Sequence, residues 1–431
     1  MGAGGFVLAE CKNISGTESN ILAGYILRLE SRSSSQRRHE FIPQAERQGK
    51  MERIRIVVVG LGHRGRHMAK LAARGFDCTD VVGVCDIDRD MWCQKQWDQD
   101  KPMAEILPEP AFYQDYLPML EELKPDLAIV ETGADIHAEF CCQALDRGIH
   151  VLSDIPVVAS LAEAGALWRS AQAARGVMMV GANPNEAGWA NALVDLHQRG
   201  LLGEPYYMEA EYIHWSEGAM AKNLTEHSEW RRHLSPIRYS THSLGPLLRI
   251  LREDLRHVSC FGTGLHCQVA EGMLHRKDDM QAAQFRTESG VVVRLLRNGA
   301  CRARIGHHSY RVFCTKGYFE KIAPKGGDPV KIRFNSDVLY GARQLTSLPL
   351  DEYMPPEYAS NPRAVGHGGV DYAMLDKLFA ALLAGTRAVP TDLREGLRMT
   401  LPGIYAEESA RRYGEVLTMH YPWDAEWKTS F

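Results

Sequence analysis

The sequence of 431 residues lacks several features that indicate particular classes of protein. No apolar run approaches the roughly 18 residues of a membrane-spanning helix. No block of Lys or Arg indicates nucleic-acid binding, and the formal net charge is -4. The ten cysteines form no C-x-x-C pair and have no histidine at zinc spacing. We therefore expect a cytoplasmic protein with reduced thiols, no metal, and no membrane or nucleic-acid partner.

The apolar run at residues 54–59 ends in G-x-G-x-x-G, formed by Gly60, Gly62 and Gly65, and a helical pattern follows it. Gly60 permits a tight turn, Gly62 leaves room for a pyrophosphate, and Gly65 allows the helix to pack closely on the strand. The N-terminus of that helix directs N–H groups and a positive dipole end at the phosphates. Strand, turn and helix in this order predict a dinucleotide site, and a glycine-rich turn that binds nothing is the alternative.

A second apolar run, at residues 81–85, ends at Asp86, about 20 residues beyond Gly65. A carboxylate at this position accepts hydrogen bonds from the adenosine ribose and favours NAD over NADP. His63 and Arg64 lie within the glycine loop, where they either contact phosphate or remain solvated. We expect NAD as the cofactor.

Apolar strands and helices continue to alternate up to residue 184, which predicts a doubly wound parallel sheet with right-handed crossovers. Ligands of such sheets bind at the carboxyl ends of the strands, so Thr132, Asp154, Pro156 and Asn183 are expected beside the cofactor. The expected strands are residues 54–59, 81–85, 111–113, 125–132, 150–154 and 177–181, and the expected helices are residues 88–97, 116–123, 136–147 and 161–175.

Beyond residue 185 the pattern predicts a largely antiparallel open sheet. Its expected strands are residues 206–214, 255–262, 282–288, 291–297 and 309–315, with helices at 243–251, 370–383 and 393–412. The fold class is therefore α/β, a Rossmann domain followed by an α+β domain. We expect an extension at residues 1–50, the NAD-binding domain at 51–184, and a domain for substrate and oligomer contacts at 185–431, whose last helices return to the Rossmann part.

Three polar clusters of the second domain are the candidates for chemistry: Tyr239 with His242, His367 with Asp371, and Tyr212 with His214. His242 stands at a helix start, which lowers the pKa of an imidazole and allows it to polarise a substrate or accept a proton. Glycines on both sides of His367 leave a bare backbone that a ligand can approach closely. Strand alternation places Tyr212 and His214 on one face.

Each of these histidines has a structural alternative, a buried imidazole that serves only the fold. A metal site built from His214, His242 and His367 would be supported by an H-x-x-H or H-x-x-E spacing, which the sequence lacks. We therefore expect no metal. The tandem at residues 307–308 precedes a strand and is expected at an exposed end.

Four of these segments resemble the glucose-fructose oxidoreductase and inositol dehydrogenase family, Gfo/Idh/MocA, over residues 53–415. They are the glycine loop, the run from Pro125 to His137, the strand before Pro156, and the strand at residues 310–317. The resemblance implies NAD(P) dependence, a Rossmann domain, and a C-terminal α/β domain whose open sheet often mediates oligomers. It adds His137 to the residues expected at the cofactor, and it implies a homo-oligomer.

The segments at residues 212–214, 239–246 and 366–372 resemble those of glycoside hydrolase family 109, the NAD-dependent α-N-acetylgalactosaminidases. That resemblance implies a redox route to hydrolysis. NAD+ takes a hydride from the sugar C3, the ketone acidifies the C2 hydrogen, the aglycone is eliminated, water adds, and the hydride returns. The cofactor would stay tightly bound and be regenerated in each turnover.

The sequence departs from these families at three places. Residues 154–156 read Asp-Ile-Pro, where most of the wider family carries Glu-Lys-Pro. The lysine of that motif assists proton transfer from the alcohol. In the glycosidase branch, a middle residue other than lysine is expected. Arg238 replaces the aspartate four residues before the active-site histidine. Residues 183–185 read Asn-Pro-Asn where the glycosidases place a tyrosine. If that tyrosine is the elimination base, its role passes to Tyr212 or Tyr239.

The sequence therefore predicts an oxidoreductase that abstracts hydride from a ring carbinol, at C3, of a sugar or glycoside. His242 and Tyr239 would handle the hydroxyl proton, because an unshifted histidine is a suitable base near pH 7. Tyr212 or His214 would position or deprotonate the adjacent carbon. The side chains expected to contact the sugar are His367, Trp230, Asp371 and Asn185. The alternatives are a plain sugar or inositol dehydrogenase and a non-catalytic nucleotide-binding protein.

Overall fold

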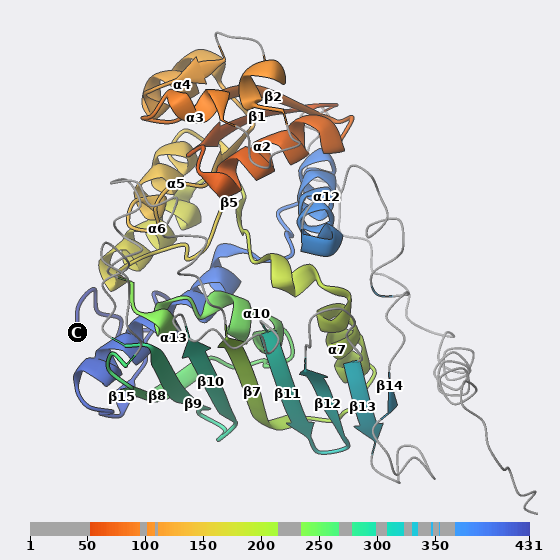
Figure 1. Ribbon diagram of the computed structural model, residues 1–431, viewed down its shortest axis with the longest axis vertical. Helices are drawn as coiled ribbons and strands as arrows, with labels where there is room; N and C mark the ends of the chain where they lie inside the picture. Colours follow the sequence, from red (N-terminus) through yellow and green to blue (C-terminus); the bar gives the residue numbers. More distant parts are fainter. Residues whose placement is uncertain are drawn as a thin grey trace, which may run out of the picture.

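The computed structural model describes residues 52–94, 101–107, 111–213, 234–266, 278–298, 308–322, 330–334, 346–347, 353 and 367–431. They form two sheets, one above the other in Figure 1, with helices on both faces of the first and between the two. No helix in these ranges has the length and apolar character needed to cross a bilayer.

The N-terminal sheet is parallel throughout, with strand order β3-β2-β1-β4-β5-β6. Its strands are β1 (Ile54–Val59), β2 (Thr79–Cys85), β3 (Phe112–Tyr113), β4 (Leu127–Val130), β5 (His150–Ser153) and β6 (Met178–Val180). The helices between them are α2 (His63–Gly75), α3 (Asp90–Cys93), α4 (Tyr116–Leu123), α5 (His137–Leu145) and α6 (Leu161–Ala173). The order changes direction between β1 and β4, which is where Rossmann sheets bind their ligands.

Strand β1 shows why this sheet requires helices on both faces. Ile56 and Val58 pack into one apolar core, whereas Val57 and Val59 pack into a second core on the opposite face. The first core contains residues of α2 and also of α12 (Val370–Leu383), a helix that the chain forms nearly 200 residues after β6. Figure 1 shows α12 beside α2. A late segment of the chain therefore completes the core of the nucleotide-binding sheet.

The second sheet has nine strands in the order β14-β13-β12-β11-β7-β10-β9-β8-β15. All neighbours are antiparallel except β7 and β10, which are parallel. Its strands are β7 (Pro205–Ile213), β8 (Leu255–Gly262), β9 (Met280–Thr287), β10 (Val292–Asn298), β11 (His308–Cys314), β12 (Gly317–Ile322), β13 (Val330–Phe334), β14 (Thr346–Ser347) and β15 (Leu417–Thr418). The predicted fold class is confirmed.

Helices α10 (Thr241–Leu248) and α13 (Leu393–Arg411) lie between the two sheets (Figure 1). Helix α13 approaches both sheets, since it contacts β8 of one and β6 of the other. A side chain at Gly396 of α13 would collide with Val180 of β6, so this glycine is required for the close approach. The sequence did not predict α7 (Gly188–Gln198) or strands β12 to β15. Helix α7 follows the Asn-Pro-Asn stretch, which has the composition of a loop.

Candidate active site

The glycine loop between β1 and α2 has the shape that a dinucleotide requires. Gly60 has φ +87°, and a Cβ there would lie 2.6 Å from the carbonyl oxygen of Glu131. A Cβ on Gly65 would overlap the carbonyl oxygen of Gly60. A Cβ on Gly62 would meet no atom within 4 Å. The first and third glycines are therefore needed by the fold, whereas the second faces open space.

The N-terminus of α2 lies at this open space. Gly62 is its N-cap residue and offers no side chain to the free N–H groups of the first turn. A helix end of this kind attracts the negative charge of a pyrophosphate. At the carboxyl end of β2, the Asp86 carboxylate accepts hydrogen bonds from Leu61 N at 2.5 Å and Asp88 N at 2.9 Å. These contacts hold Asp86 at the loop, so the residues present fit NAD.

His137 links two turns at the carboxyl edge of the sheet. Its Nδ1 lies 2.9 Å from the carbonyl oxygen of Pro156, and its Nε2 lies 2.9 Å from that of Thr132. The side chain is buried. Because each ring nitrogen contacts a backbone carbonyl oxygen, His137 holds the two turns that contain Thr132 and Pro156 in a fixed orientation.

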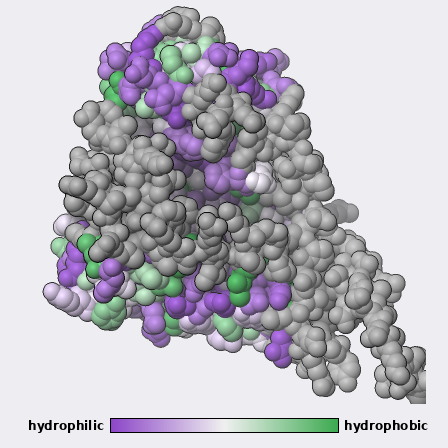
Figure 2. Space-filling model, in the orientation of Figure 1, coloured by the Kyte–Doolittle hydropathy of each residue, from purple (hydrophilic) through white to green (hydrophobic). Residues whose placement is uncertain are grey.

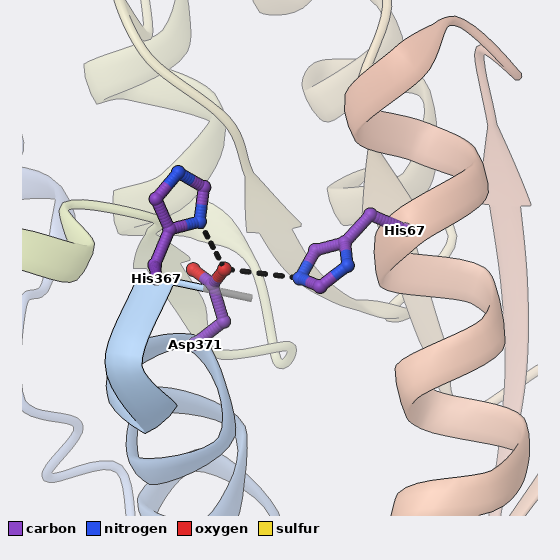
Figure 3. A group of neighbouring side chains, drawn as sticks. All are labelled: His67, His367 and Asp371. Atoms are coloured by element: carbon purple, nitrogen blue, oxygen red, sulfur yellow. Dashed lines mark hydrogen bonds and ion pairs between the residues drawn. The ribbon is translucent and has the colours of Figure 1, made fainter. Parts of the chain in front are cut away.

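Asp371, in the first turn of α12, is the centre of a buried polar cluster. Arg64 donates to both of its oxygens at 2.8 Å, and Asn183 Nδ2 donates to Oδ1 at 2.9 Å. His67 Nε2 lies 3.0 Å from Oδ2, and His367 Nδ1 lies 2.7 Å from the same oxygen. Figure 3 shows the two imidazoles reaching this carboxylate from different helices. The carboxylate is fully occupied by groups of the protein itself.

The charges in this cluster hold each other in the ionised state. Burial opposes ionisation of Asp371, but the Arg64 charge and the three hydrogen-bonding side chains hold the pKa of that carboxyl well below its usual range. Burial also opposes the charge of Arg64, but Asp371 outweighs this effect and raises the pKa of the guanidinium. The Nε of Arg64 also lies 3.9 Å from Asp154. Arg64, in the first turn of α2, therefore links the nucleotide site, the residue that follows β5, and α12.

The ligand atoms of His67, His367 and Asp371 lie within 4.8 Å of one another, a spacing that a metal ion accepts. Arg64, however, donates to the same Asp371 oxygen at 2.8 Å. Its permanent charge opposes a second cation at this point. We therefore describe the group as a hydrogen-bonded network.

Glu131 is a buried acid of this edge that the sequence analysis did not identify. It follows β4 directly, beneath the glycine loop, and its Oε2 has no hydrogen-bond partner in the part of the chain that the structure describes. Burial and the neighbouring charge of Asp154 raise the pKa of Glu131 well above its usual value. The sequence analysis included this acid in an expected apolar strand at residues 125–132, so it was not considered as a site residue.

His242 and Tyr239 lie together at the start of α10, as the sequence predicted. The Tyr239 hydroxyl lies 3.3 Å from His242 Nε2. Nδ1 of His242 is buried and has no partner among the described residues. Burial, and then the charge of Arg297, lowers the pKa of His242 to about 3. The direction of the shift agrees with the sequence analysis, but the pKa is too low for His242 to act as a base near pH 7, where it is a neutral imidazole.

Tyr212 lies between two residues that the sequence analysis missed. Its ring stacks on His308, with the ring centroids 4.0 Å apart. The Arg297 guanidinium lies 4.0 Å from the centroid of the Tyr212 ring, within the range of a cation–π contact. Arg297 is also 5.3 Å from the ring of Tyr239. His308 was expected at an exposed end, but β11 pairs it with Tyr212 in the middle of the sheet. Strand order, which no local pattern shows, brings these side chains together.

Residues 183–185 connect the two clusters, because Asn183 donates to Asp371 and Asn185 packs beneath Gly245 of α10. Arg64 and His367 further lower the pKa of His242, and Asp371 opposes them, so all three are close enough for their charges to reach the imidazole. Figure 2 shows hydrophilic residues in the central part of the molecular face, between the upper and lower domains.

Other predicted site residues lie elsewhere. Asn185 is buried, its amide nitrogen donates to Thr391 Oγ1 at 3.4 Å, and its oxygen packs beneath Gly245 of α10. Arg238 pairs with Glu407 of α13 at 3.1 Å and donates to the backbone carbonyl of Ala159, so its guanidinium is held by these two groups. His214 and Trp230 lie outside the described residues.

A family model described as an oxidoreductase family with an NAD-binding Rossmann fold, GFO_IDH_MocA, matches residues 54–182. These residues thus match the NAD-binding Rossmann domain of the Gfo/Idh/MocA family. Over 229 residues it is 28% identical to glycosyl hydrolase family 109 protein 2 of Akkermansia muciniphila, and the match covers 51% of this chain and 46% of that one. The matched part thus spans about half the length of this relative.

Two further comparisons cover most of the chain. An alpha-N-acetylgalactosaminidase of Shewanella oneidensis is 22% identical over 397 residues, which is 84% of this chain and 83% of that one. A levoglucosan dehydrogenase in complex with NADH and levoglucosan shares the fold, with a TM-score of 0.69 and 15% identity over 85% of this chain and 99% of that one. The Gfo/Idh/MocA resemblance seen in the sequence is confirmed.

Proposed function

We propose that this Gfo/Idh/MocA protein is an NAD-dependent, sugar-active oxidoreductase that removes hydride from a ring carbinol, the C3 carbinol of a sugar or glycoside. The observation that carries the proposal is the position of the neutral His242 and its partner Tyr239, close to the nucleotide-loop residue Arg64. NAD+, when bound, supplies the hydride acceptor. Gly60, Gly62 and Asp86 would hold it.

His242 and Tyr239 would bind and orient the carbinol hydroxyl. A neutral imidazole accepts a hydrogen bond without adding charge to the site. His242 is a weak base, however, because its pKa is about 3. The proton released during oxidation therefore needs a stronger acceptor elsewhere in the site.

The finer proposal is cleavage of a glycosidic bond after oxidation at C3. It is supported by the named activity of the Shewanella relative and by the position of Tyr212. The Arg297 charge over the Tyr212 ring would stabilise a tyrosinate, as a base for the C2 hydrogen requires. The proton would pass from C2 to the tyrosinate oxygen while the C–H electron pair forms the C1=C2 bond and expels the aglycone.

A plain sugar dehydrogenase is the second candidate, and one observation favours it. The stretch at residues 183–185 stands where the glycosidases carry a tyrosine, and its Asn183 side chain donates to Asp371. If Tyr212 does not replace that tyrosine, oxidation would occur without elimination.

The test uses the purified full chain with NAD+ in D2O. We would add p-nitrophenyl N-acetyl-α-D-galactosaminide and a panel of other nitrophenyl glycosides and free sugars, and follow nitrophenolate and NADH absorbance together. Nitrophenolate release with deuterium at C2 and no net NADH would support the glycosidase. NADH accumulation with the glycosidic bond intact would support the dehydrogenase. NAD binding without turnover on any substrate would contradict both.

His242→Gln and His257→Gln form a matched pair for the same assay. His242 lies at the junction of the domains, whereas His257 lies in β8. A loss of positioning of about 1 Å can lower a rate about 10²-fold, and we expect a loss of this order only for the first variant. Full turnover by His242→Gln would count against the proposed site.

A further inference from the structure

Resting on the proposed function, we propose that His367 is the catalytic base that receives the proton of the carbinol hydroxyl, and that Asp371 is its positioning residue. The pair would replace the lysine that most of the wider family carries in its Glu-Lys-Pro motif. At that position this chain has Ile155, which is buried and has no group that accepts a proton.

The hydrogen bond between these residues determines where the lone pair of His367 lies. The Asp371 carboxylate accepts hydrogen bonds from Arg64 and Asn183 and holds no proton itself, so Nδ1 of His367, 2.7 Å away, is the donor. In a neutral imidazole the other nitrogen then carries the lone pair. Figure 3 shows that nitrogen, Nε2, pointing away from Asp371. The lone pair is therefore presented outside the buried network.

The exposure of the two side chains matches this division of roles. The His367 side chain is 62% exposed, whereas that of Asp371 is 0% exposed. Nε2 of His367 has no hydrogen-bond partner among the described residues. An accessible imidazole is thus attached to a buried anion, the arrangement by which a carboxylate orients a catalytic histidine.

The backbone at His367 supports a functional role. His367 has φ +46°, a left-handed conformation that costs a residue with a Cβ roughly 1–2 kcal/mol. Gly368 and Gly369 continue at φ +64° and +87° before α12 begins. A histidine kept in this conformation, where glycine would be free of strain, indicates that the side chain itself is needed.

The Asp371 network reaches both places where this chain departs from its relatives. In residues 183–185, which stand where the glycosidases place a tyrosine, Asn183 donates to Asp371 at 2.9 Å. Arg64 fixes the same carboxylate from the first turn of α2 and lies 3.9 Å from Asp154, the residue preceding Ile155. The network thus contains a side chain of the first of these places and lies beside the second.

The step balances without a further reactant. The C–H bond of the carbinol breaks and its electron pair leaves as hydride to NAD+. The O–H bond breaks, its electron pair forms the C=O bond, and the proton goes to Nε2 of His367. The resulting imidazolium lies against the Asp371 anion. When hydride returns to the carbon, the same proton returns to the oxygen.

The test uses His367→Gly and His367→Asn. Glycine tolerates the left-handed backbone without strain and leaves space for a small base, and asparagine is among the residues best suited to this conformation but cannot take the proton. We expect kcat to fall about 10²-fold or more in both, with a much smaller change in KM. Added imidazole should restore turnover in His367→Gly and leave His367→Asn unchanged. His257→Gly, with the same imidazole, is the control.

The outcomes separate this proposal from the proposed function. If the wild type does not turn over any substrate while it binds NAD, the proposed function fails. If the wild type is active, then undiminished kcat in either variant, or a loss in His367→Gly that imidazole does not reverse, overturns the role of His367. NADH titration by fluorescence accompanies each assay, so that loss of the cofactor is not mistaken for loss of the base.

Discussion

Arg64 and Asp371 are 307 positions apart in the chain, yet they form a two-point ion pair with both N–O distances at 2.8 Å. The pair joins the nucleotide loop to the first turn of α12. Because α12 also supplies part of the core beneath β1, the dinucleotide site and the proposed base share one structural support.

We expect Asp371→Asn to destabilise the protein strongly. It leaves the buried Arg64 charge without its anion, and breaking a buried pair in this way costs about 3–5 kcal/mol. Urea unfolding would measure the loss. The exposed pair of Arg53 and Asp80, at 2.6 Å, is the matched control, because solvent screens an exposed pair and Asp80→Asn should change the stability far less. Equal losses in the two variants would contradict the structural role of Asp371.

Asp371 also predicts a pH dependence. Its pKa is lower in the folded than in the unfolded protein, so its contribution to stability is complete above the unfolded value of about 3.9 and is lost as pH falls through the lower folded value. The stability difference between wild type and Asp371→Asn should therefore be constant from neutral pH to about pH 5 and shrink only below about pH 4. A difference that already disappears at pH 6 would be inconsistent with this assignment.

His242 should affect the pH dependence of stability at a higher pH than Asp371 does. The pKa of its imidazole is lowered to about 3 in the folded protein, so the folded state prefers the neutral form. Stability from this preference is complete above the unfolded pKa of about 6.5 and declines as pH falls below it. His242→Gln removes the titration, and its urea midpoint should vary less with pH than that of the wild type between about pH 6.5 and 4. Identical pH profiles would refute the shift.

Gly62→Ala and Gly65→Ala should separate binding from folding. A methyl group on Gly62 meets no atom within 4 Å, so the melting temperature should hardly change. The same methyl group occupies the space expected for the pyrophosphate, and NADH should bind about tenfold more weakly or worse, a loss of about 1.4 kcal/mol. On Gly65 the methyl group overlaps the Gly60 carbonyl oxygen, so folding itself should suffer. NADH fluorescence titration and thermal melting measure the two effects.

Asp86→Asn tests the choice of cofactor. The amide oxygen can still accept the hydrogen bond from Leu61 N, so the loop should keep its shape. The negative charge that repels the 2′-phosphate of NADP is removed, and the ratio of NADP to NAD affinity should rise about tenfold. Paired titrations with NADH and NADPH provide the measurement. An unchanged ratio would show that Asp86 does not select the cofactor.

Local sequence patterns were sufficient for much of this protein. The run at residues 54–59 and the three glycines predicted β1, the turn and α2, because apolar periodicity and glycine conformation act over a few residues. The range of α12 was predicted as residues 370–383, which are its bounds in the structure. The pairing of Tyr239 and His242 also follows from their separation of three residues at the start of α10.

Only the tertiary structure decided which distant side chains meet. Strand order placed His308 against Tyr212, and the return of α12 to the Rossmann core joined Asp371 to Arg64. Burial then determined their chemistry, since desolvation and neighbouring charges, not residue type, lowered the pKa of His242. The sequence determined the elements and the nucleotide loop because these depend on neighbours in the chain. The tertiary structure decided the polar network of the proposed site because charge and solvent act through space.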